Sequence, residues 1–396
     1  MEFTTLISYV IAFFSLFTLN VFILLFLKHR HEYLKRPECS GKTPTVSIVM
    51  PAYNESRYIA ESIQCLFGLD YPKDKLEIIV VDDGSTDDTY KIAGSFKDSP
   101  ISIHAFRKEN GGKGAALNFG IKKAKGEFIA TMDADSFVTK DMLRELLPYF
   151  EDPEVMAVSP AVKIRPSDSW LKELQRVEYL MILFSRKLLS FLESVPVTPG
   201  PFSMFRKVVF DKVGPFDEHN LVEDQEIALR IQSHNYKIRS SMVAEVYTEP
   251  PANMKDLLSQ RVRWQRGGFR NYWRYRHMIK PEYGDFGMYS IPMQFATIGS
   301  FFSLVALMLY TFLTTPYYVR YIWFEAFGMG IDLFTFIAVF VVLLSTFFLY
   351  LAVKSFEGEK VKLRYFITFV AFYWYLMFGY NMLFLLKEVK KEAFSW

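Results

Sequence analysis

Apolar residues dominate four stretches of the chain, and each stretch is long enough to cross a bilayer as a helix, which takes roughly 20 residues. They run from about Thr5 to Leu27, from Met288 to Leu313, from Ile331 to Val353 and from Tyr365 to Leu386. We predict a membrane-spanning helix over each of them. The first stretch begins after an acidic residue and no small-residue cleavage site follows it, so we interpret it as an anchor rather than a signal peptide.

Basic residues beside these stretches predict their orientation, because positive charge is retained in the cytoplasm. The basic residues after the first stretch are Lys28, Arg30, Lys35, Arg36 and Lys42, so the chain from residue 28 onward is expected inside. Four spans then place the loop with Lys354, Lys360, Lys362 and Arg364 inside, but they place Lys387, Lys390 and Lys391 outside, against the rule. If the second stretch is instead an interfacial helix, Lys387, Lys390 and Lys391 lie inside as the rule requires, but the basic loop around Lys354 then lies outside. We therefore expect four spans.

Between about residues 45 and 250, short apolar runs alternate with amphipathic stretches. The apolar runs are Val46–Met50, Leu76–Val81, Ile101–Phe106, Glu127–Met132 and Val155–Val162. The stretches with helical periodicity between the first four runs are Glu55–Leu69, Asp87–Lys97 and Ala115–Lys125. This alternation predicts βαβ units and a mostly parallel sheet that is covered on both faces. Such sheets bind ligands at the carboxyl ends of their strands.

The first two predicted strands end in polar turns. The sequence PAYNE (residues 51–55) is suited to holding a nucleotide, with Asn54 placed to cap the next helix, although an ordinary capped turn explains it equally well. Asp82 and Asp83 end the second strand, where adjacent residues face opposite sides. One of them can therefore accept hydrogen bonds from a nucleoside while the other supports the loop. Helix capping explains Ser85 and Asp87 but not these two aspartates.

The next two motifs point to phosphate and metal chemistry. The glycine-rich segment Asn110–Asn118 offers Lys113 as a point charge for a phosphate, although the spacing of a P-loop is missing. Asp133 and Asp135 follow the fourth strand, and residues i and i+2 share one face of a strand. Two carboxylates suit Mg²⁺ or Mn²⁺, with diphosphate oxygens and water as further ligands. Solvated acids are the alternative, at a cost directly after an apolar strand.

Two later segments add a base and a cationic helix. Asp224 is the candidate general base for an acceptor hydroxyl, although acids in the first turn of a helix also need no catalytic role. Arginines recur every three or four residues from Arg263 to Arg274, a face that suits anionic headgroups. Arg263 and Trp264 can also serve the active site, the guanidinium at a diphosphate and the indole at a sugar ring.

Composition narrows the class of protein. Hydrophobic residues make up 51% and aromatic residues 17%, which is high for a soluble protein, and the net charge of +3 does not indicate a nucleic-acid partner. Cys39 and Cys65 cannot build a disulfide framework.

Ser169–Glu193 is apolar on one side and is expected to lie against the membrane or the sheet. Gln294, Asn381 and Tyr373–Tyr375 either line a glycan path or belong to an aromatic belt.

The ordered set PAYNE, VVDDGSTD, GGKGAALN, MDADS, VED and QRVRW resembles family 2 glycosyltransferases with the GT-A fold. It is most similar to the processive branch, which includes synthases of cellulose, chitin, hyaluronan and poly-N-acetylglucosamine. The resemblance covers about residues 46–270 and implies an inverting transfer from a UDP-sugar to a growing polysaccharide. The sequence QRVRWQRGG favours UDP-N-acetylglucosamine as the donor.

The resemblance also assigns roles to residues. It places Tyr53, Glu55 and Asp83 at the uridine, Asp133 at the nucleotide and Asp135 at the metal, and we group Ala52, Asp82 and Lys113 with the nucleotide-sugar-binding residues. Asp224 matches the base of the TED motif, and Gln260, Arg263 and Trp264 match QxxRW. The segment Gly200–Arg206 resembles a loop that shapes the acceptor site. Val222 replaces the threonine of TED, and the membrane part is shorter than in cellulose or hyaluronan synthases, which puts a channel within one chain in question.

These observations predict an anchor (residues 1–27), a basic linker (28–45), a cytoplasmic GT-A domain with interfacial helices (46–280) and a membrane domain with about three spans (281–396). A rival hypothesis is transfer of one sugar to a membrane lipid, such as a polyprenyl phosphate or a glycolipid. The QRVRW motif argues against this hypothesis, whereas the small membrane part argues for it. A non-enzymatic binding partner would lack a key acid, whereas Asp133, Asp135 and Asp224 are all present.

Overall fold

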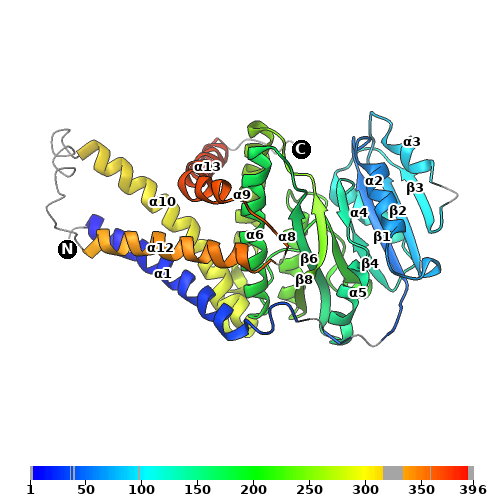
Figure 1. Ribbon diagram of the computed structural model, residues 1–396, viewed down its shortest axis with the longest axis horizontal. Coiled ribbons are helices and arrows are strands. Elements are labelled where there is room, and N and C mark those ends of the chain that lie inside the picture. Colours follow the sequence, from blue (N-terminus) through cyan, green and yellow to red (C-terminus); the bar gives the residue numbers. More distant parts are fainter. Residues whose placement is uncertain are drawn as a thin grey trace.

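The computed structural model describes residues 3–35, 37–38, 41–96, 99–314, 333–356 and 358–390. Arg36, Cys39, Lys391 and the start of the predicted span Ile331–Val353 lie outside the described residues. A domain built on one sheet occupies one side of the molecule, and long apolar helices lie on the other (Figure 1).

The sheet has eight strands in the order β3-β2-β1-β4-β7-β6-β8-β5. They are β1 (Val46–Ala52), β2 (Leu76–Asp82), β3 (Ser102–Arg107), β4 (Phe128–Thr131), β5 (Ser136–Val138), β6 (Val155–Ile164), β7 (Ser203–Arg206) and β8 (Lys237–Thr248). β1 is parallel to β2 and β4, β2 to β3, and β6 to β8. β7 runs antiparallel between β4 and β6, and β5 is antiparallel to β8. The five predicted strands are confirmed, and β5, β7 and β8 are additions.

Alternation along β1 produces two cores, because successive side chains point to opposite faces of a sheet. Ile48 and Met50 belong to a buried cluster with Ile63 of α2 (Ile59–Phe67), on one face. Val49 belongs to a second cluster with Leu117 of α4 (Lys113–Lys123), on the other face. The sheet is therefore covered on both faces, as the apolar runs predicted.

The remaining helices follow the chain around this sheet. They are α3 (Thr89–Gly94), α5 (Met142–Leu146), α6 (Trp170–Ser190), α7 (Val208–Val213), α8 (Glu223–Ser233) and α9 (Met254–Arg274). Short helical turns cover Lys73–Lys75, Leu147–Glu151, Arg276–Met278, Pro281–Tyr283 and Phe286–Ser290. α6 answers the question left open for Ser169–Glu193, because it packs on the sheet and also contacts apolar helices, with Phe184 beside Phe26 and Phe348.

Four helices in the described part of the chain are long and apolar enough to cross a membrane. They are α1 (Phe3–His29), α10 (Ile291–Thr314), α12 (Leu333–Lys354) and α13 (Leu363–Val389). Each coincides with one predicted span. Figure 1 shows α1, α10 and α12 extending away from the sheet, whereas α13 lies beside α6 and α9.

Candidate active site

The predicted site residues converge where β1, β2 and β4 end, at a cleft with a volume of about 230 Å³. Its lining consists of Pro51, Ala52, Tyr53, Glu55, Asp83, Lys113, Ala116, Asp133, Ala134 and Asp135. The parallel register brings the strand ends together, since Ala52 pairs with Asp82. Seven of the predicted nucleotide- and metal-binding residues therefore share one wall, and Asp82 lies behind it.

Asn54 joins the first two loops instead of capping a helix. Its backbone is left-handed (φ 56°), and its Oδ1 accepts a hydrogen bond from the backbone N–H of Thr86 at 2.8 Å. The helix α2 begins at Ile59 after Tyr58, so the prediction of a cap at Asn54 is wrong. Asparagine suits this position because it tolerates the left-handed region and bonds locally. The backbone N–H of Glu55 donates to Thr89 Oγ1 at 2.8 Å, which fixes the Glu55 side chain at the cleft.

Asp82 and Asp83 face opposite sides as expected, but facing the cleft and supporting the loop both fall to Asp83 rather than being divided between them. The Asp83 carboxylate faces the cleft and accepts hydrogen bonds from the backbone N–H groups of Gly111 (3.0 Å) and Gly112 (2.8 Å) and from Lys108 Nζ (2.7 Å). It therefore shapes the glycine-rich loop. Asp82 is fully buried and forms an ion pair with Arg107 Nε at 3.2 Å. Within the described residues, neither of its carboxylate oxygens accepts a hydrogen bond.

Lys113 is the electrostatic centre of the site. It begins α4, and its ammonium group forms an ion pair with Asp133 and lies 3.5 Å from Glu223 Oε1. Burial alone would lower the pKa of Lys113, but the carboxylates of Asp133, Glu223 and Asp224 raise it well above its usual range. The same ammonium opposes the rise in the pKa values of Glu55 and Asp135, so one cation interacts with acids from three separate segments.

Glu55 and Asp135 fit a divalent cation. Burial raises the pKa of Asp135 to about 7, and repulsion from Asp133 adds to the shift. Burial likewise raises the pKa of Glu55 to about 7, with further repulsion from Asp135 and Asp133. No three His, Cys, Asp or Glu side chains converge closely enough in the described ranges to hold a metal ion alone. Mg²⁺ typically takes one or two carboxylates and completes its shell with substrate phosphates, so these acids fit such a shared site.

Asp224 lies in the first turn of α8, next to Glu223. The backbone N–H and Oγ1 of Thr198 both donate to the Asp224 carbonyl oxygen, at 3.2 and 2.9 Å, which ties the segment before β7 to this turn. Burial raises the pKa of the Asp224 carboxyl, and Lys113 and Arg263 oppose that shift. Asp224 is therefore an acid in a helical first turn that also interacts with Lys113, and its role as the general base remains a prediction.

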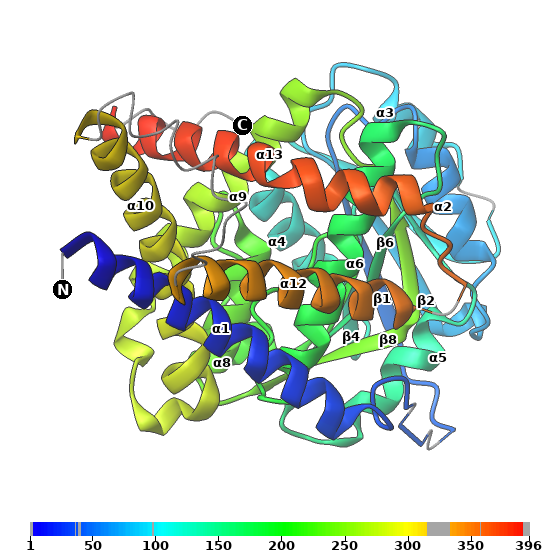
Figure 2. The same ribbon diagram turned by 60° about the vertical axis from the view of Figure 1, so that its left-hand side comes forward.

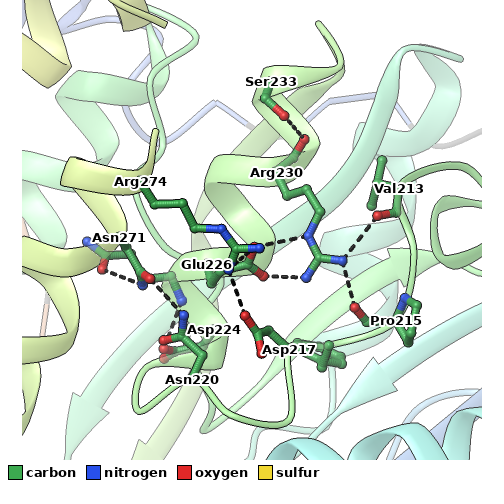
Figure 3. A network of polar contacts seen from close by, with 12 residues as sticks. Val213, Pro215, Asp217, Asn220, Asp224, Glu226, Arg230, Ser233, Asn271 and Arg274 are labelled. Atoms are coloured by element: carbon green, nitrogen blue, oxygen red, sulfur yellow. Dashed lines mark hydrogen bonds and ion pairs between the residues drawn. The ribbon is translucent and has the colours of Figure 1, made fainter. Parts of the chain in front are cut away.

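A buried network fixes α8 against α9 (Figure 3). Glu226 is fully buried and accepts hydrogen bonds from Arg230 Nε at 3.1 Å and from the Tyr275 hydroxyl at 2.6 Å. Asn271 Nδ2 donates to the Val222 carbonyl at 3.3 Å. An added Cβ at Gly267 would lie 2.4 Å from Val222 Cγ2, so the valine that departs from the TED pattern packs directly on α9.

The QxxRW residues of α9 separate into two contacts. Arg263 Nη1 donates to the Leu221 carbonyl at 2.9 Å, which places it beside the Asp224 turn. Gln260 and Trp264 instead surround Arg261: Gln260 Oε1 accepts from its guanidinium, and the Trp264 ring lies 4.3 Å from Arg261 Cζ. Arg261 is itself buried and forms an ion pair with Glu178 of α6 at 2.6 Å. The structure thus brings Arg263, but not Gln260 or Trp264, into the acid cluster.

Two residues of the site, Glu223 and Arg186, were not singled out from the sequence, whereas Gly200 begins the segment that was expected to shape the acceptor site. Glu223 contacts Lys113, and its pKa is raised to about 7 by burial. Gly200 leaves no room for a side chain, since a Cβ would lie 2.4 Å from Lys113 Nζ. Arg186 of α6 is buried, interacts electrostatically with Asp224, and among the described residues has no hydrogen-bond partner for Nε or Nη1. The GPF sequence at Gly200 was a usable signal, whereas Arg186 lies in a helix with no motif.

The sequence of this chain is similar to those of known glycosyltransferases. The sequence model of glycosyl transferase family 2 matches residues 47–214. Poly-beta-1,6-N-acetyl-D-glucosamine synthase of Staphylococcus aureus (strain COL) is 30% identical over 242 residues, which is 60% of this chain and 58% of that protein. The synthase of that name from Staphylococcus epidermidis (strain ATCC 35984) is 30% identical over 234 residues, 58% of this chain and 56% of its own length. The chain therefore matches less than two thirds of either relative.

A solved structure shows the same fold. The mannosyltransferase PcManGT from Pyrobaculum calidifontis, in complex with GDP-Man and Mn²⁺, superposes with a TM-score of 0.65 at 19% identity and covers 89% of this chain and all of its own. The predicted GT-A fold with apolar helices is confirmed. Residues 47–214 form a glycosyltransferase family 2 domain.

Proposed function

We propose that this chain is a membrane-bound, inverting glycosyltransferase that transfers N-acetylglucosamine from UDP-N-acetylglucosamine to a growing polysaccharide. The family 2 domain supports sugar transfer. The similarity to two poly-beta-1,6-N-acetyl-D-glucosamine synthases supports the choice of sugar and of a polymeric acceptor. The long apolar helices and the flanking basic residues support a membrane location with the catalytic domain in the cytoplasm.

The observation that carries this proposal is the meeting of five carboxylates around Lys113. Glu55 comes from the loop after β1, Asp133 and Asp135 from the loop after β4, and Glu223 and Asp224 from the first turn of α8. The acids can hold a cation, and that cation together with the Lys113 ammonium can hold the negative diphosphate of a nucleotide-sugar donor. The helix N-terminus that begins at Lys113 adds further positive potential for a phosphate.

The proposed transfer uses this arrangement in one step. Asp224 accepts the proton of the acceptor hydroxyl, whose oxygen forms a bond to the anomeric carbon as the bond from that carbon to the diphosphate breaks on the opposite face. The raised pKa of Asp224 makes it a stronger base than an ordinary aspartate. Lys113 and Arg263 lie where they can compensate the charge of the departing nucleotide diphosphate.

A divalent metal completes the proposed donor site, with Asp135 as its principal ligand and Asp133 or Glu55 beside it. Such an ion supplies positive charge for the leaving diphosphate. The raised pKa values of Asp135 and Glu55 support this assignment, because a cation would relieve the repulsion that produces part of the shift. The structural relative solved with GDP-Man carries Mn²⁺, which supports a divalent ion of this kind.

The test is a donor screen with the purified full chain in lipid nanodiscs. Radiolabelled UDP-sugars are supplied with Mg²⁺ or Mn²⁺, UDP release is measured, and the product is separated by size on a gel. We expect release with UDP-N-acetylglucosamine and a ladder of long products. A single labelled species that extracts into organic solvent would replace the polymerase proposal with transfer to a lipid. Release with another UDP-sugar but not with UDP-N-acetylglucosamine would contradict the assigned donor.

A further inference from the structure

The last apolar helix, α13, contacts the catalytic domain along its whole length. At its start, Glu359 in the preceding turn accepts a hydrogen bond from Arg176 Nε of α6 at 3.0 Å and lies 3.3 Å from Lys163 Nζ of β6. Lys163 and Glu359 are both almost fully buried. This end of α13 is therefore anchored in the domain by a buried ion-pair cluster.

The far end of α13 is anchored in the same domain. Glu388 Oε1 lies 2.7 Å from Arg266 Nε, and Glu388 Oε2 lies 3.0 Å from Arg270 Nη2. Both arginines belong to α9, and Arg266 is buried. Between these two ends, a stripe of buried aromatic side chains faces the domain: Tyr365, Phe369, Tyr373, Tyr380 and Phe384. Phe384 packs on Phe269 of α9, with ring centroids 6.0 Å apart.

These contacts conflict with a crossing of the bilayer. α13 has 27 residues, which is about 40 Å of helix, and a hydrocarbon core is about 30 Å thick. A spanning α13 would therefore carry Glu359 and Glu388 to opposite membrane surfaces. Both bind the catalytic domain instead. α9, which lies along α13, cannot share a bilayer core with it, because α9 carries seven charged residues: Lys255, Asp256, Arg261, Arg263, Arg266, Arg270 and Arg274.

The other apolar helices differ in this respect. His29 at the end of α1 stacks on Phe191 beside the domain, Ile291 at the start of α10 joins a cluster with Tyr272, and Phe356 just after α12 joins the main core. From these ends the three helices extend away from the sheet (Figure 1). α13 is seen nearly end-on in Figure 1 and lengthwise in Figure 2, beside α9 and α6.

We propose that α13 lies in the membrane interface, with its buried stripe on the catalytic domain and its opposite side among lipid headgroups and acyl chains. The opposite side exposes large apolar and aromatic side chains, Ile367, Phe372, Trp374 and Tyr375, while Phe378 packs on Phe301 of α10. A helix with protein on one side and lipid on the other is apolar all round, which explains why its composition resembles a span. Trp and Tyr are the residues enriched at this depth of a membrane.

The charge pattern supports the same arrangement independently. With α1, α10 and α12 as the three spans, the loop with Lys354, Lys360 and Lys362 and the basic residues Lys387 and Lys390 all lie on the catalytic side. Four spans place the second group on the far side, which was the violation of the positive-inside rule found from the sequence. Moving the last helix to the interface removes that violation without moving the loop.

Cysteine labelling in sealed vesicles tests this topology. In a background with Cys39→Ser and Cys65→Ser, single cysteines are introduced as Lys390→Cys, Lys360→Cys and Thr314→Cys. Lys360 marks the catalytic side and Thr314 the far end of α10. A membrane-impermeant maleimide is applied to vesicles of both orientations. We expect Lys390→Cys to react from the same side as Lys360→Cys. Reaction from the same side as Thr314→Cys would overturn the proposal.

A depth measurement gives a second, independent readout. Tyr375 is 74% exposed and lies close to the middle of α13. Tyr375→Cys carrying a fluorophore is reconstituted with lipids that bear a nitroxide quencher either near the headgroup or deep in the acyl chain. We expect the shallow quencher to be several-fold more effective. Stronger quenching by the deep label would place residue 375 at the bilayer centre and contradict an interfacial α13. Neither experiment depends on the sugar that is transferred.

Discussion

The donor half of the site, residues 46–135, and its acceptor half, residues 198–264, are held together in different ways. In the donor half, backbone N–H groups bind short polar side chains of neighbouring loops, as Thr86 binds Asn54 and Gly112 binds Asp83. In the acceptor half, helices are fixed by buried charges, as Arg261 is by Glu178. The first arrangement positions a ligand through local turns, and the second depends on segments far apart in the chain. We therefore expect substitutions in the two halves to impair the protein in different ways.

The largest effect within the donor half is expected for Asp135→Asn. This change keeps the size of the side chain but removes the charge that we assign to the metal. The transfer rate should fall on the order of 10² to 10³-fold, since a metal ion contributes several kcal/mol to stabilising a leaving group. Adding Mn²⁺ should no longer raise the rate. Asp74→Asn, at an exposed position of the same domain, is the control and should leave both quantities unchanged.

In α6, which is paired with the acceptor half through Arg261, Glu178→Gln should act on folding. It leaves the Arg261 guanidinium buried without a compensating charge, and breaking a buried pair in this way costs about 3–5 kcal/mol. The midpoint of denaturation in detergent should fall accordingly. The matched control is Asp70→Asn, which breaks the exposed pair with Arg144 and should cost under about 1 kcal/mol. Equal losses for the two variants would show that the Glu178–Arg261 pair does not hold the helices.

Metal binding to the donor half should depend on pH. The pKa values of Asp135 and Glu55 are raised to about 7, so protons compete with the metal below that pH. Because these pKa values are raised, metal affinity is full above about pH 7 and is lost as the pH falls through it. We expect the Mn²⁺ concentration for half-maximal rate to rise up to about tenfold between pH 7 and pH 6. A flat profile would mean that the metal does not bind these carboxylates.

The smallest effect is expected at Asn54. Asn54→Gly keeps access to the left-handed backbone but removes the hydrogen bond from Thr86, at a cost of about 1 kcal/mol. Asn54→Ala should cost about 1–2 kcal/mol more, because alanine is strained there. Both variants should raise the KM for the donor with little change in kcat, measured by UDP release. Identical behaviour of the two would show that the backbone conformation is not what matters at Asn54.

The contrast between the halves also explains what the sequence could predict. β1, β2, β4 and β6 are continuous apolar runs, so their ends and the acids that follow them were placed correctly. β8 was missed because it contains Lys237, Arg239 and Glu245, and it is stabilised by its pairing with β6, where Lys163 Nζ binds Glu245 Oε1 at 2.5 Å. That partner lies more than 80 residues away and no local pattern shows it.

The same limit applies to individual side chains. Asp133 and Asp135 are recognisable because their spacing places both on one side of a strand end. Arg266 was read as part of a basic face, yet it is buried, because its partner Glu388 belongs to another helix. The failed cap at Asn54 has a similar cause: its side chain binds Thr86, 32 residues further along the chain, and the helix starts later. Long-range partners, rather than local propensity, decided each difference.

One measurement tests most directly whether the two halves form a single site. Donor binding and turnover are compared for the native chain and Asp224→Asn, with UDP-N-acetylglucosamine and Mn²⁺, by titration calorimetry and UDP release. Because Asp224 is assigned to the acceptor proton, we predict that the variant binds the donor with unchanged affinity while its turnover falls on the order of 10² to 10⁴-fold. Full turnover by Asp224→Asn would contradict the account.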